Sequence, residues 1–207
     1  MFNLPRGRFT DALVACLVAV SIVQLAPAVQ AMVFPYGFSP FLFLNGGWRD
    51  PLAWLGPIVS QFLLASVIAT MINATFLLIA GRYAEKAVGG LGMLAIFIGG
   101  AYGGAIARTV LTASSQPITA GADAGLFALA GAGLMLYGVP LAIPINRNYS
   151  RPLQVALLAI IWAAAQMLFM WTGGTFELSR NILDPLGGLL TGALLAKPIL
   201  LWRYRKA

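Results

Sequence analysis

Six long apolar runs, each close to the length that crosses a lipid bilayer, limit what this chain can fold into. Of its 207 residues 60% are hydrophobic and 9% charged, whereas about a quarter of the residues of a soluble domain are charged, so an ordinary soluble fold is excluded. The links between the runs are short, and we find no internal repeat. The sequence therefore predicts one all-α domain over residues 1–207, a polytopic membrane protein with six transmembrane helices. The runs cover roughly residues 11–33, 57–80, 87–107, 122–143, 152–172 and 183–201.

The first third of the chain contains two features that bear on this count. The first apolar run follows a short basic end with Arg6 and Arg8, a pattern that a signal peptide shares. Because the run is long enough to span a bilayer, we expect a retained transmembrane helix, bent near Pro27. Residues 34–56 are rich in aromatic residues, glycine and proline, which predicts a loop that lies partly in one leaflet.

The thirteen basic residues divide unequally between the two sides that six spans would define. One side has three of them, Arg49, Arg108 and Arg180. The side of both termini has the other ten, which are Arg6, Arg8, Arg82, Lys86, Arg147, Arg151, Lys197, Arg203, Arg205 and Lys206. Since basic residues stay on the cytoplasmic side, the sequence predicts cytoplasmic termini, in a membrane that we expect to be a bacterial inner membrane.

The net charge of +7 has a membrane interpretation as well. The basic residues are spread between apolar segments and form no patch for nucleic acid, so we expect no nucleic-acid partner. Residues 202–206 combine aromatic and basic side chains that can meet anionic lipid headgroups, and membrane lipids are expected contacts.

The composition removes several kinds of chemistry. The chain contains no histidine, so it lacks the usual general base and the commonest metal ligand. Its one cysteine, Cys16, lies in an apolar run, where a small buried hydrophobe is the natural interpretation. We therefore expect neither a metal nor a cofactor.

Small residues recur at every third or fourth position of residues 121–132, a stretch that is apolar except for Asp123. On a helix they share one face, which lets a neighbouring helix approach closely. A charge in hydrocarbon is costly, so Asp123 should face protein or a water-filled cavity. Glycines with similar spacing are expected at helix contacts on three helices: Gly99, Gly100, Gly103, Gly104, Gly121, Gly125, Gly187, Gly188 and Gly192.

Four motifs occur in order along the predicted helices. They are residues 62–73, the sequence Gly81-Arg82-Tyr83-Ala84-Glu85, residues 121–132 and residues 184–192. Together with six spans and an aromatic first loop, they resemble the rhomboid family of intramembrane serine proteases over about residues 11–197. The resemblance implies a six-helix rhomboid-like bundle.

The resemblance also assigns the catalytic positions. Active rhomboids carry a serine on the fourth helix and a histidine on the sixth, and the matching residues here are Asp123 and Pro185. Two histidines in or before the second helix correspond to Ala69 and Leu64, whereas an asparagine is kept as Asn73. Because serine is a poor nucleophile until a base takes its proton, loss of both groups implies a rhomboid-like pseudoprotease without catalytic residues.

Three interpretations of Asp123 are open. It can be structural, hydrogen-bonded to backbone amides or Asn73, or paired with Arg108 or Arg180, and we favour this one. It can bind a ligand or partner in a residual cavity. It can also form a pair with Asp184 in which two carboxylates share a proton and activate water.

These interpretations lead to three hypotheses for function. The favoured one is an inactive protein that binds other transmembrane proteins or helices, as a structural subunit or assembly factor of a larger membrane complex. The second is a membrane-embedded protease with aspartate-based chemistry. The third is a binder of a lipid or small molecule that uses the former active-site cavity.

Overall fold

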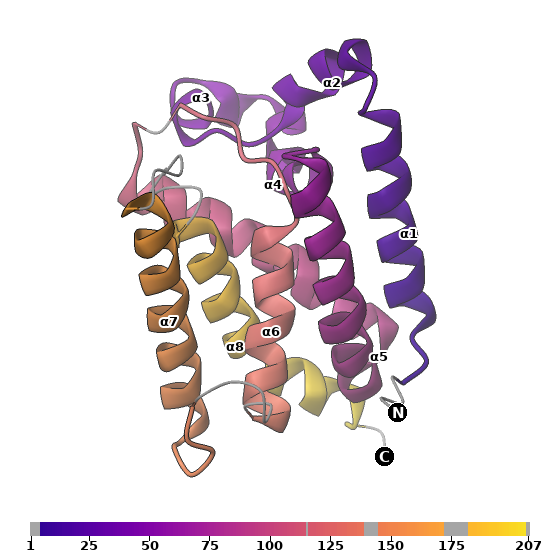
Figure 1. Ribbon diagram of the computed structural model, residues 1–207, viewed down its shortest axis with the longest axis vertical. Helices are drawn as coiled ribbons and strands as arrows, with labels where there is room; N and C mark the ends of the chain where they lie inside the picture. Colours follow the sequence, from indigo (N-terminus) through magenta and orange to yellow (C-terminus); the bar gives the residue numbers. More distant parts are fainter. Residues whose placement is uncertain (1–4, 115, 139–144, 172–181, 206–207) are drawn as a thin grey trace.

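The computed structural model describes residues 5–114, 116–138, 145–171 and 182–205, and these form a bundle of helices without a strand (Figure 1). The predicted all-α class is confirmed. Three described helices are long and apolar enough to cross a membrane, in α5 (Val67–Leu111), α7 (Arg151–Trp171) and α8 (Asp184–Arg203). A bent pair of N-terminal helices would make a fourth span, and α6 (Asp123–Tyr137) is apolar but shorter.

The bend expected near Pro27 separates α1 (Arg8–Val23) from α2 (Pro27–Val33). The two directions differ by 116°. Pro27 starts α2, where its missing N–H costs little. At this corner the Gln24 side chain donates to the Phe62 carbonyl at 2.8 Å and accepts from the Leu64 N–H at 3.0 Å. These two bonds fix the corner to the chain segment that precedes α5.

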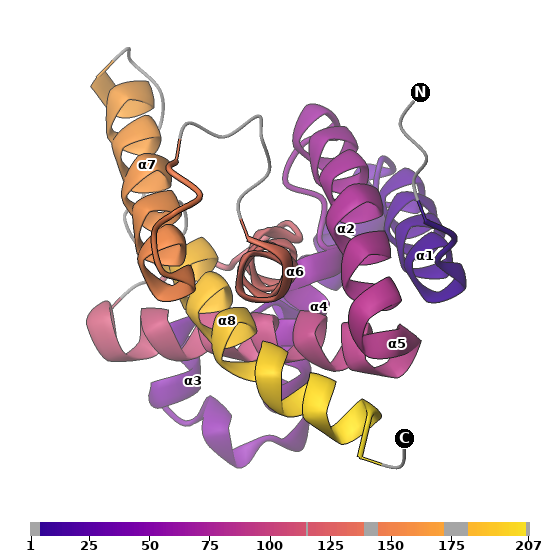
Figure 2. The same cartoon turned by 90° about the horizontal axis from the view of Figure 1, so that it is seen from below.

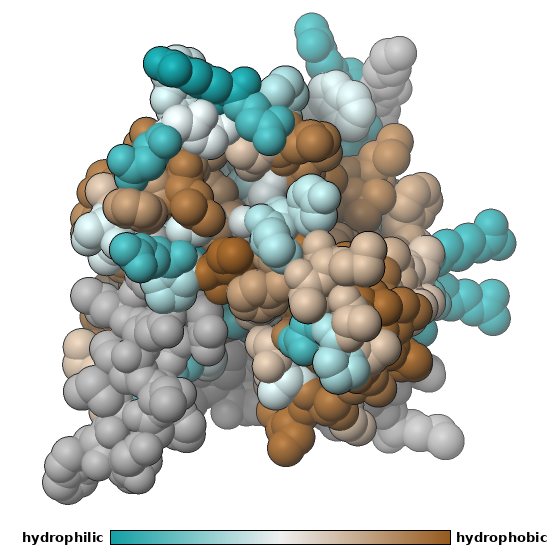
Figure 3. Space-filling view, turned by 90° about the horizontal axis from the view of Figure 1, so that it is seen from above, coloured by the Kyte–Doolittle hydropathy of each residue, from teal (hydrophilic) through white to brown (hydrophobic). Residues whose placement is uncertain are grey.

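Short helices occupy the aromatic segment between α2 and α5. They are η1 (Phe34–Tyr36), α3 (Pro40–Leu44), η2 (Gly47–Arg49), η3 (Pro51–Leu55) and α4 (Gly56–Phe62). They lie across one end of the bundle, where Figure 3 shows apolar and polar side chains side by side. The second span was expected to begin at residue 57, and this is wrong. The helix there ends at Phe62, and α5 begins at Val67 because Ser66 caps it by accepting from the Ala69 N–H at 3.1 Å.

The helix α5 contains the second and third predicted runs. The sequence analysis predicted a link between two helices at residues 81–86. This prediction is wrong, because the stretch is helical. The chain instead turns at Gly89, whose φ of 80° favours glycine, and the two halves of α5 run in different directions (Figures 1 and 2).

The polar residues of this stretch hold α1 in place. The Glu85 carboxylate accepts from the Thr10 N–H at 2.8 Å and from the Phe9 N–H at 3.2 Å, at the amino end of α1. Arg82 forms an ion pair with Asp11 at 2.8 Å. Sequence reasoning mistook polar side chains that bind a neighbouring helix for polar side chains in a loop.

The tightest part of the bundle is formed by α6, α8 and the second half of α5. On α5, Gly99 and Gly103 face Thr191 of α8. On α8, a Cβ at Gly188 would collide with the Ala124 backbone of α6. Because backbones touch there, the glycines permit distances that larger residues would forbid. The other expected glycines also lie at contacts. Gly100 and Gly104 face Ala124, and Gly121 lies beside Asn73. Gly125 faces Phe97, Gly187 faces Gly103, and Gly192 faces Ala128.

The helix α7 packs against the bundle along a narrow strip. Its Trp162 ring lies 4.6 Å from the Phe127 ring of α6, between centroids. Several of its large apolar side chains are exposed, among them Leu153, Ile160, Ile161, Met167 and Leu168. Figure 2 shows α7 at the edge of the bundle. The last residues of two predicted runs, 139–143 and 172, lie outside the described residues.

Candidate functional site

Asp123 and Pro185 lie at the amino ends of α6 and α8, where these helices meet α5. Asp123 is the first residue of α6, and Pro185 lies in the first turn of α8 and is buried. A Cβ built on Gly104 of α5 would come 2.8 Å from the Ala124 Cβ and 2.9 Å from the Asp184 carbonyl oxygen. The structure therefore brings the two helix ends together at one glycine.

Asp123 accepts a hydrogen bond from Asn73. The distance from Asn73 Nδ2 to Asp123 Oδ1 is 2.9 Å, and Asn73 is buried on the first half of α5. Gly121, with φ of 113°, leads the chain into α6 beside both side chains. Asn73 is one of the partners that the sequence analysis considered for Asp123.

The other two second-helix positions, Ala69 and Leu64, take part in contacts of their own. Ala69 lies in the first turn of α5, and its N–H donates to Ser66. Leu64 lies before α5, and its N–H donates to Gln24. These two positions contribute to the start of α5 and to the corner between α1 and α2.

A buried ion pair joins α5 to α8 at the same end of the bundle. Arg108 Nη1 lies 3.5 Å from Asp184 Oδ2, and the side chains are 0% and 4% exposed. Arg108 Nη2 also donates to the Pro117 carbonyl at 2.7 Å. Sequence reasoning placed Arg108 in the link after the third apolar run, and this is wrong, because Arg108 lies in the last turn of α5 with its side chain inside the protein. Arg180 lies outside the described residues.

Gln61 is a site residue that sequence reasoning missed. It is buried in α4, and its Oε1 accepts from the Gly125 N–H at 2.9 Å. The first N–H groups of a helix have no partner within it, so Gln61 satisfies one of them in the first turn of α6. A lone amide in an apolar run was the signal that could have identified it, since a buried amide requires partners.

The polar side chains described above are two amides, Asn73 and Gln61, with two carboxylates and a guanidinium. Each carboxylate has a separate partner, Asn73 for Asp123 and Arg108 for Asp184. The chain has no imidazole, and within the described residues no three His, Cys, Asp or Glu side chains gather where a metal could bind. This arrangement fixes the ends of three helices relative to one another.

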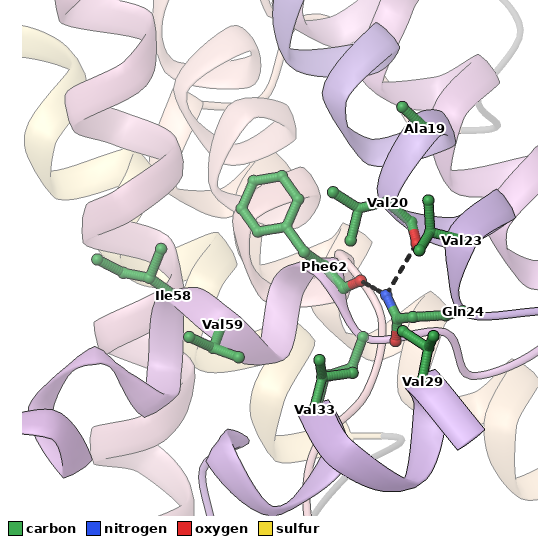
Figure 4. Close-up of a pocket in the computed structure, with 10 residues that line it drawn as sticks. Ala19, Val20, Val23, Gln24, Val29, Val33, Ile58, Val59 and Phe62 are labelled. Atoms are coloured by element: carbon green, nitrogen blue, oxygen red, sulfur yellow. Dashed lines mark hydrogen bonds between the residues drawn. The ribbon is translucent and has the colours of Figure 1, made fainter. Parts of the chain in front are cut away.

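A groove lies elsewhere, between α1, α2 and α4 (Figure 4). Its volume is about 460 Å³, and its lining is apolar apart from Gln24. Figure 4 shows Val20 and Val23 from α1 with Ile58, Val59 and Phe62 around the space. A smaller groove of about 230 Å³ lies between the aromatic segment and the second half of α5. Neither groove is lined by Asp123 or Pro185.

Comparison with known proteins adds one finding. The model of the rhomboid domain family matches residues 51–202, from η3 to the last turn of α8. The matched segment includes both helix ends described above and begins after α1. No curated protein matches the chain in sequence.

Proposed function

The chain belongs to the rhomboid family of membrane proteins, and on this premise we propose that it is a catalytically inactive member that binds other transmembrane proteins. The observation that carries the proposal is the hydrogen bond between Asn73 and Asp123. A carboxylate in a structural bond stands where the resemblance expects a nucleophile, and Pro185, with no ionisable group, stands where it expects the base.

The proposal includes six spans with both termini in the cytoplasm. The bent pair α1–α2, the two halves of α5, α6, α7 and α8 would provide them. The start of α1 and the end of α8 lie at one end of the bundle in Figure 1, as an even number of spans requires. The residues Lys86, Arg151 and Arg203 are exposed in the segments at this end. We propose a bacterial inner membrane as the location because the basic side of the chain is so well defined.

Cysteine labelling tests this topology. In a Cys16→Ser background, Asn148→Cys should be protected from a membrane-impermeant maleimide added to intact cells, whereas Asn45→Cys should react. Both asparagines are exposed, so accessibility of the side chain is matched. Reaction of Asn148→Cys from outside the cell would contradict the cytoplasmic termini.

Two surfaces support binding of a transmembrane segment. The first half of α5 exposes Ile68, Met71 and Phe76, and α7 exposes its apolar side chains over most of its length. Exposed apolar area alone does not drive association in lipid, where close packing of small residues is needed. Gly133 on α6 provides such a place, since nothing lies within 4 Å of where its Cβ would be. We propose that a partner helix packs at these surfaces, with the protein acting as a subunit or assembly factor of a larger complex.

Substitution of Asp123 separates this proposal from its alternatives. We expect Asp123→Ala to lower the free energy of unfolding by about 1–3 kcal/mol, because it leaves the buried Asn73 amide without this acceptor. Asp123→Asn is the matched control, since its carbonyl oxygen can still accept from Asn73. Partner membrane proteins, identified by mass spectrometry after gentle solubilisation of native membranes, should co-purify with both variants.

Other outcomes would contradict the proposal in different ways. Cleavage of a transmembrane substrate that Asp123→Ala abolishes would support aspartate-based proteolysis. Loss of a bound small molecule on the same substitution would support the ligand binder. A serine labelled by a fluorophosphonate probe, or a protein that always purifies alone as a monomer, would overturn the inactive binding protein.

A further inference from the structure

We propose that the end of the bundle that holds both termini carries a binding site for the headgroup of an anionic phospholipid. The site is built from Lys86 of α5, Arg203 of α8 and the neighbouring Tyr204, with Arg151 of α7 at the end of α6. This inference does not depend on whether the protein binds other membrane proteins.

The Arg203 guanidinium is held in one place by the kink of α5. Its Nη1 donates to the Lys86 carbonyl at 3.0 Å, one turn before the kink, and its Cζ lies 3.6 Å from where a Cβ on Gly89 would be. A guanidinium has five N–H donors, so most of them stay available for an anion. The same guanidinium lies 5.4 Å from the centroid of the Tyr204 ring.

Further aromatic rings and a further cation lie at this end of the bundle. Tyr137, at the end of α6, is within electrostatic reach of Arg203 and Tyr204 and donates to the Tyr83 carbonyl at 3.2 Å. The Arg151 guanidinium lies directly against Gly138, the residue after Tyr137. Cations from three helices, α5, α7 and α8, therefore lie at the carboxyl ends of α6 and α8.

The acidic residues that the structure describes do not balance these cations. At this end the described acids are Asp11, which pairs with Arg82, and Glu85, whose carboxylate accepts from the amino end of α1. The other described acids, Asp50, Asp123 and Asp184, lie in segments at the opposite end of the bundle. Because the Arg203 guanidinium contacts the Lys86 backbone, an anion at this point would be attracted by the charges of both residues.

The position of the site selects a lipid as the source of the anion. Leu201 and Leu194 are exposed apolar residues on α8 just before Arg203, and Trp202 and Tyr204 are exposed beside it. Exposed leucines followed by aromatic and basic side chains mark the depth at which lipid headgroups meet water. Phosphate oxygens of an anionic lipid would lie at the height of these guanidinium and ammonium groups.

The test measures lipid binding to the full chain in neutral detergent micelles. Phosphatidylglycerol is titrated in, bound lipid is counted by native mass spectrometry, and the midpoint of thermal unfolding is followed, since a ligand of the folded state raises it. We expect phosphatidylglycerol to bind and stabilise, and phosphatidylcholine and inorganic phosphate to have much smaller effects. Lys86→Gln should weaken phosphatidylglycerol binding roughly fivefold, and Lys86→Gln with Arg203→Gln roughly thirtyfold.

The control is Arg49→Gln at the opposite end. Arg49 is also an exposed guanidinium beside an aromatic ring, 5.2 Å from the Trp48 centroid, and its loss should leave binding unchanged. Arg203→Lys keeps the charge and should keep most of the affinity for phosphatidylglycerol. This variant tests the position even if Arg203→Gln does not fold. Equal binding of phosphatidylcholine and phosphatidylglycerol would overturn the site, as would an equal loss in Arg49→Gln. Full stabilisation by inorganic phosphate would overturn the lipid as the ligand.

Discussion

Arg108→Met is expected to lower the free energy of unfolding by about 3–5 kcal/mol, the usual cost of removing one partner of a buried ion pair. The substitution leaves the Asp184 carboxylate inside the protein without its guanidinium partner. It also leaves the Pro117 carbonyl without the donor that binds it at 2.7 Å. Urea or thermal unfolding in micelles, followed by tryptophan fluorescence, measures the loss.

A double-mutant cycle shows whether the pair itself is responsible. Arg108→Met with Asp184→Leu should recover a large part of the loss, because an apolar pair of similar volume often replaces a buried ion pair without cost. The recovery should be incomplete, since the Pro117 carbonyl still lacks its donor. Strictly additive losses in the double variant would show that the two side chains do not stabilise the protein through one another.

Gly131→Ala is expected to destabilise the bundle by about 2–3 kcal/mol, near the upper end of the cost of overpacking. The new Cβ would collide with the Leu189 carbonyl oxygen of α8 and come 3.2 Å from the Ala193 nitrogen. These are backbone atoms of a packed helix, so they cannot move aside as a flexible side chain could. Thermal unfolding in micelles with circular dichroism checks the change.

Gly133→Ala is the matched control, two residues further along α6. Nothing lies within 4 Å of its Cβ position, so only the helix preference of alanine acts, which favours it over glycine by about 0.5–1 kcal/mol. Gly133→Ala should therefore be neutral or slightly stabilising. Similar losses in the two variants would mean that contact with α8 at Gly131 is not the cause. A loss of partner binding in Gly133→Ala alone would support the partner surface proposed on α6.

Much of the architecture follows from local sequence patterns. An apolar run in lipid must satisfy its backbone hydrogen bonds internally, so the composition alone predicts helices. Proline within the first apolar run predicted the bend at Pro27, and closely spaced glycines indicated which helices could touch. The family resemblance identified Asp123 and Pro185 as the two positions to compare, and the structure places them at adjoining helix ends.

Other features depend on contacts between distant segments, which no local pattern specifies. Residues 81–86 are polar because Glu85 and Arg82 bind α1. The sequence pattern of such a polar helical stretch is the same as that of a polar loop. The chain turns instead at Gly89, one of several glycines in that region, because only there does the packing require a positive φ.

The sequence by itself determined a helical membrane protein with a basic end and a site without an imidazole. Only the tertiary structure decided that Arg108 is buried against Asp184, that Gln61 caps α6, and that Lys86 and Arg203 meet at the kink. The physical reason is that the length of an apolar run and the spacing of its glycines are properties of one segment, and they determine its structure locally. The partner of a polar side chain is chosen by how the segments pack, and in these three pairs the partners are 76, 64 and 117 residues apart.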